Sequence, residues 1–424
     1  MSPIDPTHAQ PTVELALESR VRGGANGRTS SIIGESGGTV NGVTPVHRTP
    51  EVVVKIRGAV LETMEASAPY AESQPLRVEE LELGEPGPTE LRVRITAAGV
   101  CHSDLSVVNG NRPRPLPMLL GHEAAGVVEH VGAEVTDLAV GQHVVMAFLP
   151  RCGECAACKT EGLLPCTVGS KANASGTLIE GSMHLRSETR GNVYHHLGVS
   201  GFATHAVVDR RSVVPVGEDV PAAIAAVMGC AVLTGGGAVI NAAQATPDDV
   251  VAVVGLGGVG LAAVLVAKAV GCRRVIAVDA LAEKLELAKE FGADEALTPD
   301  ELVVLEDKPR VVIEAAGHPR AFETAFNATA VGGVTVTVGL PAPGAMSQIE
   351  PLKITAEARQ IIGSYLGSAV PAVDIPKYEQ MWRDGALPLE KLITSHITLE
   401  QINEAMDELD AGRAVRQVIE FPDA

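Results

Sequence analysis

VVAVVGLGGVGLAA, at residues 250–263, is the stretch that decides the fold of much of this chain. A run of five apolar residues leads into G-x-G-x-x-G at Gly255, Gly257 and Gly260, and a helical pattern follows. The next predicted strand, RRVIAVD, ends in Asp279, 19 residues beyond Gly260. Such glycines let the backbone approach a pyrophosphate that rests on a helix N-terminus. The stretch therefore predicts a dinucleotide site, although glycines that merely allow tight strand–helix packing are the alternative.

Asp279 indicates which dinucleotide is bound. A carboxylate at a strand end can accept hydrogen bonds from both ribose hydroxyls, and it would repel a 2′-phosphate. No arginine follows it in DALAEK, at residues 279–284. The sequence therefore favours NAD over NADP. Lys284 could reach the adenosine ribose, or it could be a solvated helix lysine.

The pattern changes along the chain. Residues 54–214 contain short valine-rich strands bounded by Gly or Pro, such as LRVRITAAGV at 91–100, and predict a β-rich body. From about residue 222, strands alternate with helices, which predicts a parallel sheet covered on both faces. Residues 1–53 are rich in Gly, Ser, Thr and Asn. We expect a disordered tail there, or an artefact of start-codon choice with the true chain beginning near Val54.

Composition excludes several classes of protein. The chain has 424 residues, an apolar fraction of 46% and a formal net charge of −19. That charge disfavours nucleic acid and anionic membranes as partners. The N-terminus lacks a secretion-signal pattern, and glycines and charges interrupt every long apolar run, so no membrane span is expected. We expect a cytoplasmic protein.

Four cysteines lie close together in CGECAACKTEGLLPC, with the spacing C-x2-C-x2-C-x7-C. Four thiolates can enclose one tetrahedral zinc and leave no open position, so this cluster predicts a structural zinc site. A redox or iron–sulfur site is the alternative. An odd total of seven cysteines in a long chain disfavours a disulfide framework. The four cysteines of this lobe are Cys152, Cys155, Cys158 and Cys166.

Five motifs follow one another along the chain in this order: GVCHSDL, GHEAAGVVEHVG, the four-cysteine lobe, the apolar segment VMGCAVLTGG and GLGGVG. In order and spacing they resemble the zinc-dependent medium-chain alcohol dehydrogenases, over residues 56 to 421. The resemblance implies an α/β protein with a GroES-like β-rich catalytic domain at 54–230 and 366–424. A Rossmann NAD-binding domain, a doubly wound parallel sheet, would occupy residues 231–365.

The resemblance also implies a second zinc ion, which would be catalytic. Its ligands would be Cys101, His122 and Cys230, with a fourth position left for the substrate oxygen. Glu123 resembles the family's carboxylate behind the metal, a transient ligand. Asp104 matches the carboxylate that orients the ligand histidine. The implied reaction is reversible hydride transfer between an alcohol and NAD, with an aldehyde or ketone as product.

Ser103 matches the hydroxyl that receives the substrate proton. The best-known members place a histidine three residues later to finish the proton relay, and this chain has Ser106 there. His102 matches a contact to the cofactor pyrophosphate, with a solvent-facing histidine as the alternative. Phe148 resembles an aromatic residue of the substrate pocket, or it is plain core. Further cofactor contacts are implied at Gly258, Val259, Thr234, Val338 and Arg416.

Residues 176–205 resemble the longer, animal- and glutathione-linked branch of the family, which implies a homodimer. Glutathione-linked members hold a thiol adduct with a basic residue shortly after the last lobe cysteine, and Ser170 and Lys171 match this imperfectly. Oxidation of a formaldehyde–thiol adduct is therefore the alternative activity. A family member that has lost turnover and only binds zinc and nucleotide is the alternative from another functional class.

Overall fold

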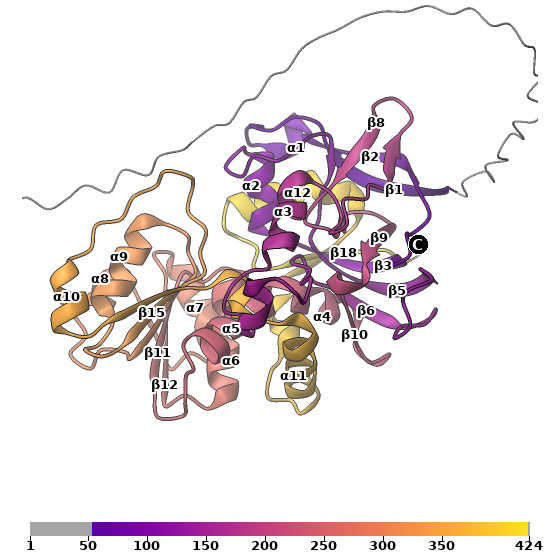
Figure 1. The fold of residues 1–424 in the computed structure, drawn as a ribbon. Coiled ribbons are helices and arrows are strands. Elements are labelled where there is room, and N and C mark those ends of the chain that lie inside the picture. The colour runs from indigo at the N-terminus through magenta and orange to yellow at the C-terminus, as the bar shows by residue number, and fades with distance from the viewer. Residues whose placement is uncertain (1–52, 423–424) are drawn as a thin grey trace, which may run out of the picture. The chain divides into compact units, whose positions relative to one another are not determined.

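The computed structural model describes residues 53–422. The predicted tail at 1–53 lies outside this part of the chain, apart from Val53. The described residues form one parallel sheet, one antiparallel-rich sheet and one small closed barrel (Figure 1).

The parallel sheet has six strands, and every neighbouring pair is parallel. Its order leaves a switch point between the first and fourth strands in chain order, where ligands bind in open α/β sheets. The predicted α/β fold with a doubly wound sheet is confirmed. In spatial order the strands are β13 (Glu295–Leu297), β12 (Arg274–Val278), β11 (Val250–Val254), β14 (Val311–Glu314), β15 (Val334–Thr337) and β16 (Gln360–Gly363).

All five residues of β11 are buried, because helices cover both faces of the sheet. Val251 and Val253 belong to the main core, whereas Val250, Ala252 and Val254 belong to a smaller cluster on the other face. The helices of this part are α6 (Gly258–Val270), α7 (Ala282–Glu290), α8 (Pro299–Val303), α9 (Pro319–Ala328) and α10 (Pro351–Ala356).

The β-rich part of the fold, also predicted from the sequence, is confirmed. Its C-terminal strand β18 (Gln417–Glu420) pairs antiparallel with β3 (Glu90–Val100), so the end of the chain returns to the N-terminal half. The rest of that sheet is β5 (Glu123–Val131), β6 (His143–Met146), β9 (His205–Asp209), β10 (Val213–Pro215) and β17 (Ser395–Ile397). The barrel contains β1 (Val54–Leu61), β2 (Leu76–Leu83), β4 (Met118–Leu119), β7 (Leu185–Ser187) and β8 (Gly191–His195).

Short helices connect these strands. The α-helices are α1 (Tyr70–Ser73), α2 (His102–Val108), α3 (Thr167–Ser175), α11 (Pro371–Arg383) and α12 (Ile402–Asp410). The 3-10 turns are η1 (Ala156–Thr160), η2 (Arg210–Ser212), η5 (Tyr365–Ser368), η6 (Leu389–Leu392) and η7 (Leu399–Gln401).

A long apolar helix runs through the core of the protein. By length and composition Ala222–Ala242 could cross a membrane, but 83% of its most apolar window is buried inside the protein, as in a core helix. A Cβ on Gly235 would lie 2.2 Å from the Val259 carbonyl oxygen, so this glycine allows α6 to pack closely. In order, the helix consists of α4 (Ala222–Val227), the π-helical η3 (Met228–Val232), α5 (Leu233–Gly237) and the π-helical η4 (Ala238–Ala242).

Candidate active site

Four potential metal ligands meet in the core of the β-rich part. Cys101 caps the N-terminus of α2, His122 precedes β5, Glu123 begins it, and Cys230 lies in the π-helical turn η3. One donor atom from each lies within 4.8 Å of all the others, and all four residues are buried. A π-helical turn is an irregularity that often occurs at functional sites.

Asp104 connects this cluster to the start of α2. Its Oδ2 accepts a hydrogen bond of 3.1 Å from the Cys101 N–H, and its Oδ1 lies 3.0 Å from His122 Nδ1. One carboxylate therefore fixes both the helix start and the imidazole. His122 Nε2 is buried and has no hydrogen-bond partner among residues 53–422. That nitrogen and two thiols form a donor set that suits zinc with one position left open.

The electrostatics of the cluster favour a cation. The Cys230 thiol, as hydrogen-bond donor, holds the pKa of Cys101 well below its usual value, although burial opposes this. Burial lowers the pKa of His122, but Asp104 and the Cys101 sulfur outweigh it and raise that pKa well above its usual value. Burial raises the pKa of Glu123 to about 8, despite the nearby Arg416 guanidinium. Zinc would replace the protons that these groups share.

Glu123 sits in a space that a glycine leaves open. In the β3–β5 ladder it lies opposite Gly99, where a Cβ would come within 2.5 Å of Glu123 Oε2. Its Oε1 lies 3.2 Å from Arg416 Nη2 and 3.9 Å from His122 Nε2. The carboxylate is thus held between the imidazole and the guanidinium.

A cavity of about 450 Å³ joins this cluster to the glycine-rich turn. Cys101, Cys230, Ser103 and Phe148 line it, whereas Asp104, His122 and Glu123 lie buried behind its wall. Of the sequence-predicted cofactor contacts, all but one line this cavity, and the exception is Gly260. The contacts that line it are Gly255, Gly257, Gly258, Val259, Asp279, Lys284, His102, Thr234, Val338 and Arg416.

The glycines of the turn have separate functions. Gly260 packs so closely that its Cβ would lie 1.8 Å from the Gly255 carbonyl oxygen, which explains its place outside the cavity. No atom of the described chain lies within 4 Å of a Cβ on Gly257, so that side of the turn is open. A Cβ on Gly258 would lie 2.9 Å from Arg416 Cζ. The guanidinium therefore faces the N-terminus of α6, where backbone N–H groups favour a phosphate.

Two backbone donors hold the Asp279 carboxylate. The Leu256 N–H donates to its Oδ2 at 2.8 Å, and the Leu281 N–H donates to its Oδ1 at 3.1 Å. Asp279 follows directly after β12 and is half-buried at the cavity wall. Its negative charge is thus fixed beside the glycine-rich turn.

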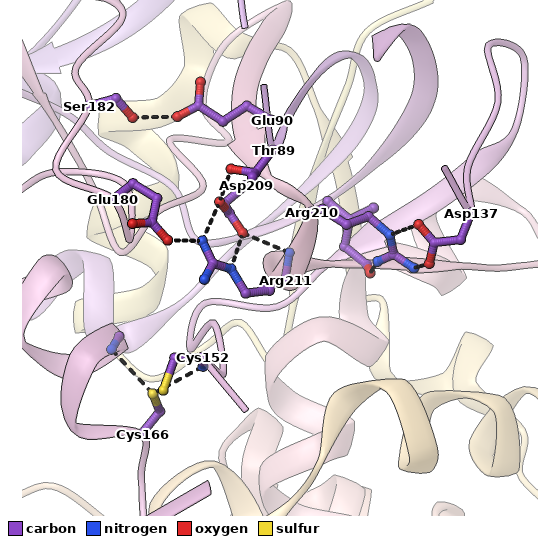
Figure 2. A network of polar contacts seen from close by, with 12 residues as sticks. Thr89, Glu90, Asp137, Cys152, Cys166, Glu180, Ser182, Asp209, Arg210 and Arg211 are labelled. Atoms are coloured by element: carbon purple, nitrogen blue, oxygen red, sulfur yellow. Dashed lines mark hydrogen bonds and ion pairs between the residues drawn. The ribbon is translucent and has the colours of Figure 1, made fainter. Parts of the chain in front are cut away.

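The four lobe cysteines form a second cluster, with sulfurs within 4.8 Å of one another. Two pairs, Cys152–Cys158 and Cys155–Cys166, have sulfurs 3.9 Å apart. Zinc–sulfur bonds of about 2.3 Å in a tetrahedron place sulfurs roughly 3.8 Å apart, far beyond a disulfide bond. The Cys166 sulfur accepts hydrogen bonds from the Cys152 and Gly169 N–H groups, each at 3.3 Å. Figure 2 shows Cys166 beside Cys152.

Comparison with known proteins gives the family. The model of the alcohol dehydrogenase GroES-like domain matches residues 87–218, and that of the zinc-binding dehydrogenase domain matches residues 258–384. "Putative alcohol dehydrogenase D" of Mycobacterium tuberculosis is 35% identical over 370 residues, 84% of this chain and 98% of its own length. This chain belongs to the zinc-dependent medium-chain alcohol dehydrogenase family.

Solved structures of similar proteins agree with this dehydrogenase fold. An alcohol dehydrogenase zinc-binding domain protein from Burkholderia ambifaria is 30% identical, with a TM-score of 0.81 over 88% of this chain and 100% of that chain. Benzyl alcohol dehydrogenase from Acinetobacter calcoaceticus is also 30% identical, with a TM-score of 0.79 over 87% and 99%. A dehydrogenase from Escherichia coli, 26% identical with a TM-score of 0.69 over 87% and 99%, was solved with NADH.

The residues expected to take part in the proton relay, Ser103 and Ser106, lie at the cavity, as does the expected pyrophosphate contact His102, which is exposed. The Ser106 hydroxyl donates to the His102 carbonyl oxygen at 2.8 Å, so its hydrogen bond to the backbone would have to break before it could pass a proton onward. Ser170 and Lys171 lie on α3 and are not among the described residues that line the cavity.

Three residues at or near the site were missed by sequence reasoning. Tyr365 and Arg112 line the cavity, and the buried His196 lies beside Asp104, with 3.2 Å between His196 Nδ1 and Asp104 Oδ1. For Tyr365 no local signal existed. The arginine pair in NRPRP, at residues 111–115, and the His pair in YHHLG, at residues 194–198, were visible but had no partner in the sequence.

Proposed function

We propose that this dehydrogenase oxidises alcohols and reduces aldehydes or ketones with NAD, and that each subunit holds two zinc ions. The catalytic ion would be held by Cys101, His122 and Cys230, with Glu123 behind it. The structural ion would be held by the four lobe cysteines. One observation carries the proposal: a single cavity is lined both by ligand thiols and by the glycine-rich turn with Asp279.

The side chains suit the steps of this reaction. The zinc ion supplies Lewis acidity toward an alcohol or carbonyl oxygen. Asp104 keeps the proton on His122 Nδ1, so that Nε2 offers its lone pair. Ser103 lines the cavity with the ligand thiols and could accept the proton of the substrate hydroxyl. NAD held at the glycine-rich turn would supply the hydride acceptor for the carbon that bears this hydroxyl.

Asp279 supports NAD over NADP as the cofactor. Its carboxylate is fixed by two backbone donors and lines the cavity. A 2′-phosphate would meet this charge at close range, whereas ribose hydroxyls can donate to it.

We also propose a homodimer in the cytoplasm. β16 is the edge strand of the parallel sheet, and Ile361 on it is exposed, as are Leu352 and Ile354 nearby. An exposed edge strand can pair with a second copy of itself. The seven thiols are all free, which suits a reducing compartment. Light scattering of the purified protein would measure the subunit number.

Elemental analysis and cofactor reduction test the proposed function. Two zinc ions per subunit and NADH formation with an alcohol are expected. Cys101→Ser and Cys230→Ser should abolish turnover while NAD still binds in calorimetry. Cys272→Ser is the matched control, because Cys272 is equally buried but belongs to neither cluster. Near-normal activity of either ligand variant with no loss of zinc would contradict the assignment.

Oxidation of a formaldehyde–thiol adduct is tested separately. Formaldehyde would be assayed with NAD, alone and with a low-molecular-weight thiol. Activity that depends on the thiol and exceeds that with simple alcohols would favour the adduct as the substrate.

A further inference from the structure

The cavity wall near the ligand cluster is aromatic and basic. The Phe148 ring packs edge-on against His122, with centroids 5.5 Å apart, and edge-on against Tyr365, with centroids 5.7 Å apart. Since Phe148 and Tyr365 both line the cavity, this series of rings leads from the ligand imidazole into the space for a substrate. Arg112 lines the same cavity.

Arg112 has no carboxylate partner in the described part of the chain, residues 53–422. Its Nη2 donates to the Pro341 carbonyl oxygen at 3.2 Å, and no acidic side chain lies within 4.0 Å of its guanidinium. Neighbouring Arg114 is also without an ion pair there, and its buried Nε has no partner. Both arginines influence Tyr365, whose pKa is raised by burial and lowered in part by their charges. Two cations thus lie near one tyrosine.

The acidic residues of the cavity wall belong to its other part. Within residues 53–422 they are Asp279, which is fixed to the glycine-rich turn, and Asp410, which ends α12. Asp410 is two residues from Gly412, and a Cβ on Gly412 would lie 3.6 Å from Lys284 Nζ. Lys284 and Asp279 are the residues assigned to the adenosine end of NAD. The lining beside Tyr365 therefore offers the Arg112 guanidinium and no carboxylate to balance it, and a zinc ion would neutralise the sulfur charge of Cys101 and Cys230 there.

We infer that the substrate of this dehydrogenase carries an anionic group, most simply a carboxylate, on an aromatic alcohol or aldehyde. The ring would pack against Phe148 and Tyr365, and the carboxylate would bind Arg112. A guanidinium binds a carboxylate through two parallel hydrogen bonds, and the half-buried charge of Arg112 favours such a partner. This inference rests on the proposed function, because it names the substrate class of the same site.

The test compares matched alcohols at saturating NAD. The set contains benzyl alcohol, the 3- and 4-(hydroxymethyl)benzoates, their methyl esters and 4-(aminomethyl)benzyl alcohol. For the wild type we expect kcat/KM for at least one carboxylate to exceed that for its ester by about 10-fold or more, the size of a charge-assisted contact. The amine should be the poorest substrate. High salt should reduce the preference only in part, since it screens a half-buried charge less than an exposed one.

Arg112→Gln should bring the ratio of carboxylate to ester near unity. The Arg77→Gln control should leave it unchanged, because Arg77 is an exposed residue of β2 that is not among the residues lining the cavity. A wild type that oxidises the neutral alcohols equally well or better would overturn the inference and leave the proposed function intact. The inference would also be overturned if the Arg112→Gln protein kept the preference for the carboxylate, or if the substitution mainly raised the KM for NAD. If no alcohol of the set reduced NAD but another alcohol did, only the inference would fail, and if no alcohol of any kind did, the proposed function would fail as well.

Discussion

His196 Nδ1 lies 3.2 Å from Asp104 Oδ1, the same oxygen that lies 3.0 Å from His122 Nδ1. Asp104 therefore serves two buried imidazoles, one of which is a proposed zinc ligand. Burial would raise the pKa of Asp104, but the two histidines outweigh it and lower that pKa. His196 is in this sense a positioning residue that acts through Asp104.

Replacing His196 should weaken binding of the catalytic zinc, although His196 is not one of the proposed ligands. Asp104→Asn is expected to weaken catalytic zinc binding by about 10- to 100-fold, as the loss of an outer-shell carboxylate does. His196→Phe should have a smaller effect in the same direction, because Asp104 keeps its bond to His122. Competition with a chelator measures both. His195→Phe is the matched control: it also buries a phenyl ring, but His195 bonds to the His184 N–H instead. Equal zinc loss in both Phe variants would contradict the assignment.

Gly99→Ala should disturb Glu123. The new Cβ would lie 2.5 Å from Oε2 and 3.3 Å from Cβ of Glu123, its partner in the β3–β5 ladder. We expect a loss of about 1–3 kcal/mol in unfolding free energy, the usual cost of overpacking, together with reduced turnover. Gly84→Ala serves as the control, since its Cβ would meet only ordinary contacts at 3.6 Å or more. Chemical denaturation and kcat are the measurements. A Gly99→Ala protein as stable and active as the Gly84→Ala protein would show that Glu123 is not confined.

The buried Glu90 should make stability depend on acidic pH. Burial raises its pKa, but His184 Nε2 at 2.7 Å, the Gly87 N–H at 2.6 Å and the Ser182 hydroxyl reverse this and lower the pKa to about 2. Figure 2 shows the contact between Ser182 and Glu90. Because the folded pKa is depressed, the stabilisation exists above the ordinary pKa near 4.5 and disappears as pH falls toward 2.

Glu90→Gln should therefore cost roughly 1–3 kcal/mol of unfolding free energy near pH 7, the cost of leaving buried partners without their charge. The gap between the two proteins should close between about pH 4.5 and pH 2. Denaturation curves of both proteins at each pH measure this difference in unfolding free energy. Any loss of zinc at acidic pH would affect both proteins alike and would cancel in the difference. A gap that stayed constant down to pH 2 would show that Glu90 is not ionised in the fold.

Local patterns were enough for the parts of the site that lie within one segment. The run from Val250 to Gly260 predicts a strand, a turn and a helix start, and β11 and α6 have those bounds within a few residues. Asp279 follows its strand as expected. These predictions succeed because the glycine-rich turn needs only nearby residues to form.

Contacts between distant segments could not be predicted in this way. Arg416 reaches Glu123 and Gly258 because β18 pairs with β3, a pairing of segments more than 300 residues apart. Tyr365 reaches the cavity from a turn after β16, where Leu366 and Gly367 have positive φ angles. Such convergence depends on tertiary pairing, which leaves no spacing pattern in the chain.

Asp279 should control the choice of cofactor. Asp279→Ser removes the charge and shortens the side chain, so kcat/KM for NADP relative to NAD should rise by about 10-fold or more, since one charge–charge repulsion at close range is relieved. Asp279→Asn is the informative companion, because it keeps one acceptor for the Leu256 and Leu281 N–H groups while it removes the charge. If both variants raise the ratio, charge is the cause. Unchanged ratios in both would refute the role of Asp279.

The cysteine lobe should bind zinc without taking part in turnover. Cys158→Ser removes one of four sulfurs that lie within 4.8 Å of one another, so one of two zinc ions should be lost. A lobe without its metal leaves three thiols and two backbone donors around an empty centre, because the Cys152 and Gly169 N–H groups point at Cys166. We expect a lower thermal midpoint and, in the protein that remains folded, kcat within a few-fold of the wild type. Cys272→Ser, a change in a more deeply buried cysteine outside both clusters, should keep both ions. A Cys158→Ser protein that still holds two zinc ions would contradict the tetrahedral site. A Cys158→Ser protein that keeps the catalytic zinc ion but loses turnover would place the lobe in the reaction itself.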